Sequence, residues 1–239
     1  MTDVSASPMP LKPGTPFEDP FGVLRRVMQP RERKAPGERC EMCGEDIERH
    51  SHVANLAERR LLCTCRGCYL LFTVPGAGGL RMRAVPERYR LVDNFAFTQE
   101  QWDDLAVPVD LVFLFRQSRE FEQGQQSDID PAKPRQLVCC YPSPAGATES
   151  ELDLSTWDDI VAANASFADV EPDVEAVLLR RDAASGFTCF VVPIDACYEL
   201  VGLVRQYWSG FQGGTEVWQH IDGFFADLYR RARVEPPRG

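Results

Sequence analysis

Five of the nine cysteines of this chain lie within residues 40–68. They form the runs Cys40-Glu-Met-Cys43 and Cys63-Thr-Cys65-Arg-Gly-Cys68. The pairs Cys40/Cys43 and Cys65/Cys68 have 21 residues between them, close to the usual separation in a four-thiolate zinc site. Each C-x-x-C pair can present two thiolates to one tetrahedral ion. The spacing therefore predicts a metal site whose ligands are Cys40, Cys43, Cys65 and Cys68.

The identity of the metal follows less directly from the residues. Zinc held by four thiolates has no open position for water, so it would be structural. Iron in the same four thiolates would make a one-electron carrier of the rubredoxin kind, and an iron–sulfur cluster also needs four thiolates. Rubredoxin sites hide their sulfurs behind aromatic rings, whereas this segment offers only Tyr69 and Phe72. We therefore expect zinc, with iron as the alternative; a set of buried free thiols is the plainest competing interpretation.

Three further residues lie close enough in sequence to bear on this site. Cys63 is a fifth thiol, which either replaces Cys65 as a ligand or simply ends a strand. His50 and His52 alternate along an expected strand and so point to opposite faces, where one could reach the metal or both could be packing residues. An HNH-type nuclease is disfavoured because no Asp precedes His52 and no Asn or His follows Cys68.

Charge and composition restrict the class of partner. The chain has 239 residues, a net charge of −10 and a pI of about 4.9, which argue against nucleic-acid or anionic-membrane binding. The charge is uneven, because residues 1–90 carry net +4 and residues 91–239 carry net −14. The sequence contains neither a membrane-length apolar run nor a secretory signal pattern. We therefore expect a cytoplasmic protein, in a reducing compartment where clustered cysteines more often bind metal than form disulfides.

The chain divides into three parts by composition. Residues 1–36 hold seven prolines and are expected to be a disordered arm, with a short amphipathic helix at 21–28 that docks on a partner or on its own domain. Residues 37–75 are the cysteine-rich module. Its pattern predicts a knuckle at Cys40–Gly44, a hairpin over 50–63 and a helix that opens at Cys65, in treble-clef order, with a zinc ribbon as the competing geometry. Residues 76–83 are expected to be a flexible connection.

Residues 84–232 are expected to form an acidic α+β domain. Residues 109–115 form a nearly continuous apolar run and predict a central strand. Further strands are expected at 136–141 and, as a hairpin, at 175–179 and 187–192. Helices are expected at 153–164, 194–208 and 215–232, with Asp195 and Thr215 as caps of the last two. Strict β–α alternation is missing, which favours α+β over a doubly wound sheet.

Two surface features could take part in binding. The segment 142–150 is rich in small residues and is expected to be an open turn between a strand and a helix, where a small ligand could bind if the protein were an enzyme. It lacks the Lys and spaced glycines of nucleotide loops. Arg59, Arg60 and Arg66 lie beside the cysteines and could meet an acidic partner, or they could simply be solvated. The chain has no recognisable nucleophile motif, and we expect no catalytic residues.

Several stretches together resemble a known family. They are Arg39–Gly44, Arg60–Phe72, Tyr141–Ser150, Val192–Leu203 and Gly213–Trp218. Over about residues 36–232 the chain resembles an uncharacterised actinobacterial family encoded beside nickel–iron hydrogenase genes. The resemblance implies an accessory role in hydrogenase assembly, maturation or electron transfer, with hydrogenase subunits or maturation factors as partners. We therefore expect a non-enzymatic metal-binding accessory protein, with a rubredoxin-like electron carrier as the alternative.

Overall fold

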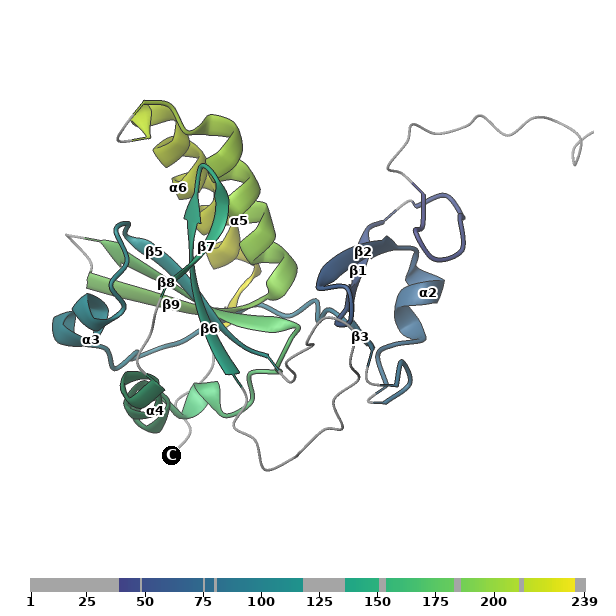
Figure 1. Cartoon of the computed structure of the whole chain (residues 1–239), viewed down its shortest axis with the longest axis horizontal. Helices are drawn as coiled ribbons and strands as arrows, with labels where there is room; N and C mark the ends of the chain where they lie inside the picture. Colours follow the sequence, from purple (N-terminus) through teal and green to yellow (C-terminus); the bar gives the residue numbers. More distant parts are fainter. Residues whose placement is uncertain are drawn as a thin grey trace, which may run out of the picture. The chain divides into compact units, whose positions relative to one another are not determined.

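Two β-sheets form the frame of the chain in the computed structural model (Figure 1). The described residues all belong to one compact unit, Gly37–Gly239. The expected arm at 1–36, with its short helix, lies outside the described residues. The structure describes residues 39–47, 49–74, 76–79, 81–117, 136–150, 154–182, 186–210 and 213–234.

The smaller sheet has three strands in the order β2-β1-β3. Strands β1 (Ser51–Asn55) and β2 (Arg60–Thr64) form the predicted antiparallel hairpin, and helix α2 (Arg66–Leu70) follows at once. The expected order of hairpin and helix is thus confirmed. Strand β3 (Met82–Ala84) pairs with β1. The prediction of a flexible connection at 76–83 is therefore wrong at its end, because backbone pairing with β1 holds Met82 and Arg83.

The larger sheet has seven strands in the order β10-β4-β9-β8-β5-β6-β7. Strand β5 lies between β8 and β6, so the prediction that its apolar run is central is confirmed. β8 and β9 form the expected hairpin partners. Neighbouring strands are antiparallel except for β10 and β4. The strands are β4 (Arg90–Leu91), β5 (Leu111–Gln117), β6 (Gln136–Ser143), β7 (Gly146–Ser150), β8 (Glu175–Asp182), β9 (Gly186–Pro193) and β10 (Arg233–Val234).

Helices cover both faces of the larger sheet (Figure 1). Successive strand side chains point to opposite faces, so Phe113 enters the core beneath α5 and α6, while Val112 enters the core that holds Trp102 and Trp157. This architecture confirms the α+β class, and the three predicted helices correspond to α4, α5 and α6. The helices are α3 (Gln99–Asp104), α4 (Leu154–Ala163), a 3-10 turn (Ala165–Phe167), α5 (Ile194–Tyr207) and α6 (Gly214–Arg231). None of the described helices is long and apolar enough to cross a membrane.

Residues 142–150 differ from the expected open turn between a strand and a helix. Strand β6 continues to Ser143, and β7 returns antiparallel beside it, so that Tyr141 lies opposite Thr148. Gly146 has a φ of +128°, a conformation that favours glycine and lets the chain reverse over a short turn. The segment is therefore a hairpin, and β7 ends the order of strands in this sheet.

The two predicted helix caps are wrong. Helix α5 begins at Ile194 after Pro193, so Asp195 lies in its first turn and its side chain makes no cap hydrogen bond. The N-cap of α6 is Gly213 rather than Thr215. Gly213 has a φ of +86°, and a Cβ there would lie only 3.2 Å from the Trp208 ring. A left-handed backbone at a crowded position explains why glycine, and not a hydroxyl side chain, begins this helix.

Candidate metal centre

Four cysteine sulfurs come together at one end of the smaller sheet. The Sγ atoms of Cys40, Cys43, Cys65 and Cys68 all lie within 4.8 Å of one another. The Cys43 and Cys65 sulfurs are 3.7 Å apart, far beyond disulfide length. A tetrahedral ion with metal–sulfur distances of about 2.3 Å would place its ligand sulfurs roughly 3.8 Å apart. The donor set and spacing therefore fit a four-thiolate metal ion.

The first cysteine pair lies on a tight knuckle. The Cys40 N–H donates to the Glu45 carbonyl, and the Gly44 N–H donates back to the Cys40 carbonyl, both at 2.8 Å. Gly44 has a positive φ, +74°, which lets the chain turn back beneath the two sulfurs. The knuckle is also joined to β2, because the Glu41 N–H donates to the Cys63 carbonyl at 2.9 Å and the Glu41 carboxylate accepts from the Cys63 N–H.

The second pair opens helix α2, as the sequence predicts. Cys65 is the N-cap residue, in extended conformation, and its carbonyl accepts from the Tyr69 N–H at 3.0 Å. Cys68 follows within the first turn. The Tyr69 ring is buried, and its hydroxyl donates to the Val85 carbonyl at 3.1 Å, which ties α2 to the segment after β3. Packing of α2 on the hairpin thus fixes where the second pair points.

The electrostatics of the cysteine group show what a cation would supply. Burial raises the pKa of Cys40, but backbone N–H groups of Cys65, Cys43 and Met42 outweigh it and lower the pKa to about 6. Burial, and then the neighbouring cysteines, raise the pKa of Cys68 to about 12. The protein thus stabilises the thiolate of Cys40 by itself, whereas burial and the neighbouring cysteines oppose ionisation of Cys68. A bound metal ion would offset that cost, since thiolates are the form that ligates.

The structure separates the other candidate ligands from this group. Among the described residues, the group that could hold a metal consists of the four cysteines alone. Cys65 belongs to this group, so Cys63 does not replace Cys65. The Cys63 backbone is instead hydrogen-bonded to Glu41 in the knuckle. His50 is exposed. His52 points away to helix α5, where its Nδ1 lies 2.6 Å from Asp195 Oδ2.

Two of the three neighbouring arginines already have acidic partners. Arg60 lies 2.7 Å from Glu58 and 3.5 Å from Glu41. Arg66 lies 2.7 Å from Glu87 and stacks over the Tyr69 ring. Their side chains are about half exposed, so each pair contributes only about 0–1 kcal/mol and could be exchanged for an external acid. They are solvated ion pairs rather than free cations.

Contacts beyond the cysteines join this module to the larger sheet. Ala54 and Val85 are buried in the core beneath α5 and α6. Arg83 donates to the Pro172 carbonyl at 2.6 Å and to the Glu171 carboxylate at 2.9 Å. The His52–Asp195 bond is the third connection. It could not be predicted from sequence, because its partners are 143 residues apart and Asp195 resembles an ordinary helix cap.

Comparisons with known proteins add a family but no function. A family model described as a family of unknown function, DUF5947, matches residues 39–232. This agrees with the expected resemblance to an uncharacterised family over about residues 36–232. Neither the curated proteins nor the solved structures contain a match to the chain.

Replacement of Cys40 by serine should release the metal. The Ser hydroxyl is a poor ligand, so we expect metal content to fall from about one ion per chain to nearly none, and hydrogen exchange to accelerate across residues 39–74 but not in β5 or β8. Cys63→Ser is the matched control and should keep its metal. If Cys40→Ser retained stoichiometric metal, or if Cys63→Ser lost it, the ligand assignment would be wrong.

The His52–Asp195 bond should make stability depend on pH. Its bond to Asp195 raises the pKa of His52 despite partial burial. A pKa raised on folding stabilises the protonated state, so this contribution is complete below about pH 6.5 and disappears as pH rises through the folded pKa. His52→Gln should therefore lower the free energy of unfolding by about 1 kcal/mol at pH 6, and by less at pH 8.

Urea unfolding followed by tryptophan fluorescence measures this difference. Asp195→Asn should reproduce the effect of His52→Gln, because either change removes the charged pair. His50→Gln, at an exposed position two residues away, should leave the pH dependence unchanged. An equal loss of stability at pH 6 and pH 8 in His52→Gln would show that the histidine is only a packing residue.

Proposed function

The chain belongs to the DUF5947 family of unknown function, and we propose that it is a non-enzymatic, zinc-binding accessory protein that acts through protein–protein contacts. The observation that carries this proposal is the concentration of exposed apolar side chains beside the four cysteines. Of the six large apolar side chains that are exposed in the described part of the chain, four lie between Met42 and Val74.

Zinc is supported by the closed donor set. Four thiolates fill a tetrahedral shell and leave no position for a substrate, so the ion would stabilise the module and not carry out chemistry. The surroundings give less support to an electron-transfer iron site. Cys43 is exposed, and the buried Tyr69 is engaged by the Val85 carbonyl and the Arg66 guanidinium.

The docking surface that we propose is formed by Leu70, Leu71 and Val74. These residues lie at the end of α2 and just beyond it, with exposed fractions of 51, 63 and 64%. Single exposed apolar residues are ordinary, but neighbouring ones more often mark an interaction site. Metal binding would hold α2 in place, because Cys65 is its N-cap residue and Cys68 lies in its first turn, and would thereby present this surface to a partner.

The proposed partners are subunits or maturation factors of a nickel–iron hydrogenase. Support for them comes from the family resemblance of the sequence. An acidic chain with net charge −10 is poorly suited to nucleic acid, which favours a protein partner. A reducing cytoplasm would keep the four thiols available for metal, so we place the protein there.

Binding measurements with purified partners test this proposal. The zinc-loaded chain would be titrated with each hydrogenase subunit and maturation factor from the same source. We expect one of them to bind, and Leu70→Ser/Leu71→Ser to weaken that complex by at least about tenfold while metal content stays the same, as for a hot spot.

Tyr229→Ser is the matched control, since Tyr229 is also exposed but lies on α6 in the other part of the fold. It should bind like the unaltered chain. Absence of binding to every hydrogenase component would refute the proposed partners. Equal weakening by both variants would refute the proposed surface.

A further inference from the structure

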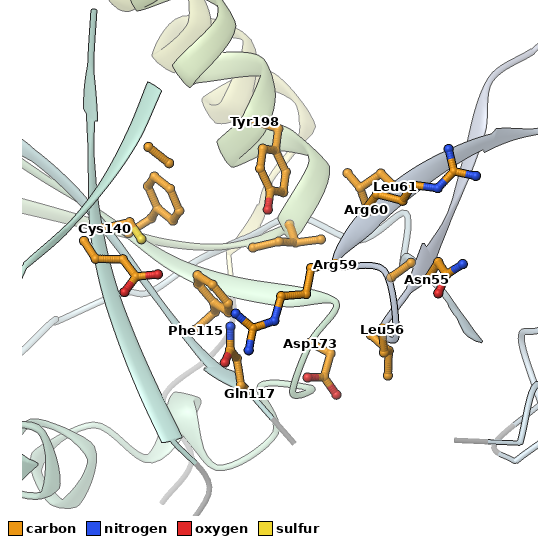
Figure 2. A pocket seen from close by; sticks show the side chains of 15 residues that line it. Asn55, Leu56, Arg59, Arg60, Leu61, Phe115, Gln117, Cys140, Asp173 and Tyr198 are labelled. Atoms are coloured by element: carbon orange, nitrogen blue, oxygen red, sulfur yellow. The ribbon is translucent and has the colours of Figure 1, made fainter. Parts of the chain in front are cut away.

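A cavity of about 210 Å³ lies where the β1–β2 turn faces the larger sheet (Figure 2). Its volume is below the range of about 300–1,000 Å³ usual for drug-sized ligands, so an occupant would be small. Most of its wall is apolar and comes from the turn, β5 and α5. The apolar side chains of this wall include Leu56, Leu61, Phe113, Phe115 and Ile194.

The cavity contains an arginine that the fold does not neutralise. No ion pair or hydrogen bond joins the Arg59 guanidinium to another residue in the described ranges, in contrast to Arg60 beside it. Figure 2 shows the Arg59 side chain extending toward Phe115 and Gln117, while the Arg60 side chain points away. An arginine among apolar side chains favours an anionic group at that position.

The backbone at Arg59 gives a second indication. Its φ is +50°, a left-handed conformation that costs a non-glycine residue about 1–2 kcal/mol. Glycine or asparagine would satisfy such a turn more easily. The turn alone therefore gives no reason for arginine here, whereas a role of the side chain in the cavity does.

The wall formed by β7 has the opposite charge. Glu149 lines the same cavity, and its carboxylate has no ion pair among the residues that the structure describes. The second acid of the wall, Asp173, is already 3.8 Å from the Arg83 guanidinium. Two charged side chains of this mainly apolar cavity are thus without an ion pair among the described residues, namely Arg59 from the β1–β2 turn and Glu149 from β7.

We propose that this cavity binds a small zwitterion with an apolar body, namely an apolar α-amino acid. Arg59 would hold the carboxylate, Glu149 would hold the ammonium group, and the phenyl rings of β5 with Ile194 would contact the side chain. Charge-assisted hydrogen bonds at both ends would give orientation, and the apolar wall would select against polar amino acids. The proposal is independent of the hydrogenase partners, and it adds a ligand that contacts both the metal module and the larger sheet.

Three probes that share one phenyl group test this assignment. They are L-phenylalanine, 3-phenylpropionate, which lacks the ammonium group, and 2-phenylethylamine, which lacks the carboxylate. Saturation-transfer NMR and titration calorimetry on the full metal-loaded chain should show that L-phenylalanine binds more tightly than either analogue. Glycine, which has both charges but no apolar body, should bind most weakly.

Substitutions at the two charges should change selectivity in opposite directions. Arg59→Gln should weaken the binding of L-phenylalanine and of 3-phenylpropionate by at least about tenfold. It should strengthen the binding of 2-phenylethylamine, because the charge that repels the ammonium group is removed. Glu149→Gln should weaken the binding of L-phenylalanine and of 2-phenylethylamine. It should strengthen the binding of 3-phenylpropionate, because the charge that repels its carboxylate is removed. Arg60→Gln is the matched control and should bind all three probes as the unaltered chain does.

Three results would overturn the proposal. The first is no binding of L-phenylalanine at millimolar concentration. The second is binding that Arg59→Gln and Arg60→Gln weaken equally. The third concerns the stability of the chain without ligand. If Arg59→Gln and Glu149→Gln each lowered the free energy of unfolding, and the double variant lowered it no further, the two residues would pair with each other in solution and not with a ligand. Each variant's melting temperature and metal content separate these outcomes from misfolding.

Discussion

The meeting of four cysteine sulfurs is the constraint on which the smaller sheet and helix α2 depend. The segment from Arg39 to Val85 has few large buried side chains, among them Val53, Leu62 and Tyr69. Such a short segment cannot build a sufficient core alone, and a metal ion commonly supplies the missing stability. Because one cysteine pair comes from the knuckle and the other from the start of α2, one ion would fix both against the hairpin.

The consequences of that constraint extend to the rest of the molecule. The hairpin fixed by the cysteines also carries His52, which bonds to Asp195 on α5, and the turn that brings Arg59 to the cavity. Helix α2 presents Leu70 and Leu71 outward. A loss of metal would therefore disturb the proposed partner surface and the proposed ligand cavity together, although neither includes a cysteine of the cluster. A metal ion that takes no part in chemistry would thus still affect both proposed binding sites.

Local patterns in the sequence predicted the local parts of this arrangement. The C-x-x-C spacing predicted four cysteines that the structure brings together, and the apolar run of β5 predicted a strand inside the sheet. Both patterns act over a few residues. Helix α3 was missed, although the capping box of Thr98 and Gln101 marks its start. The contacts across the chain could not be predicted, because nothing near Asp195 distinguishes a carboxylate that caps its helix from one that bonds a histidine on β1. The cavity combines residues from several elements in the same way.

Elemental analysis with a visible absorption spectrum tests directly whether the four cysteines hold a structural zinc ion. The chain should be purified without added metal and kept reduced. We expect one zinc ion per chain and a colourless protein, since zinc has no redox chemistry and its four-thiolate site would be structural. One iron per chain with thiolate charge-transfer bands would refute the structural zinc site and identify an electron carrier. A folded chain without any metal would show that the smaller sheet does not depend on an ion.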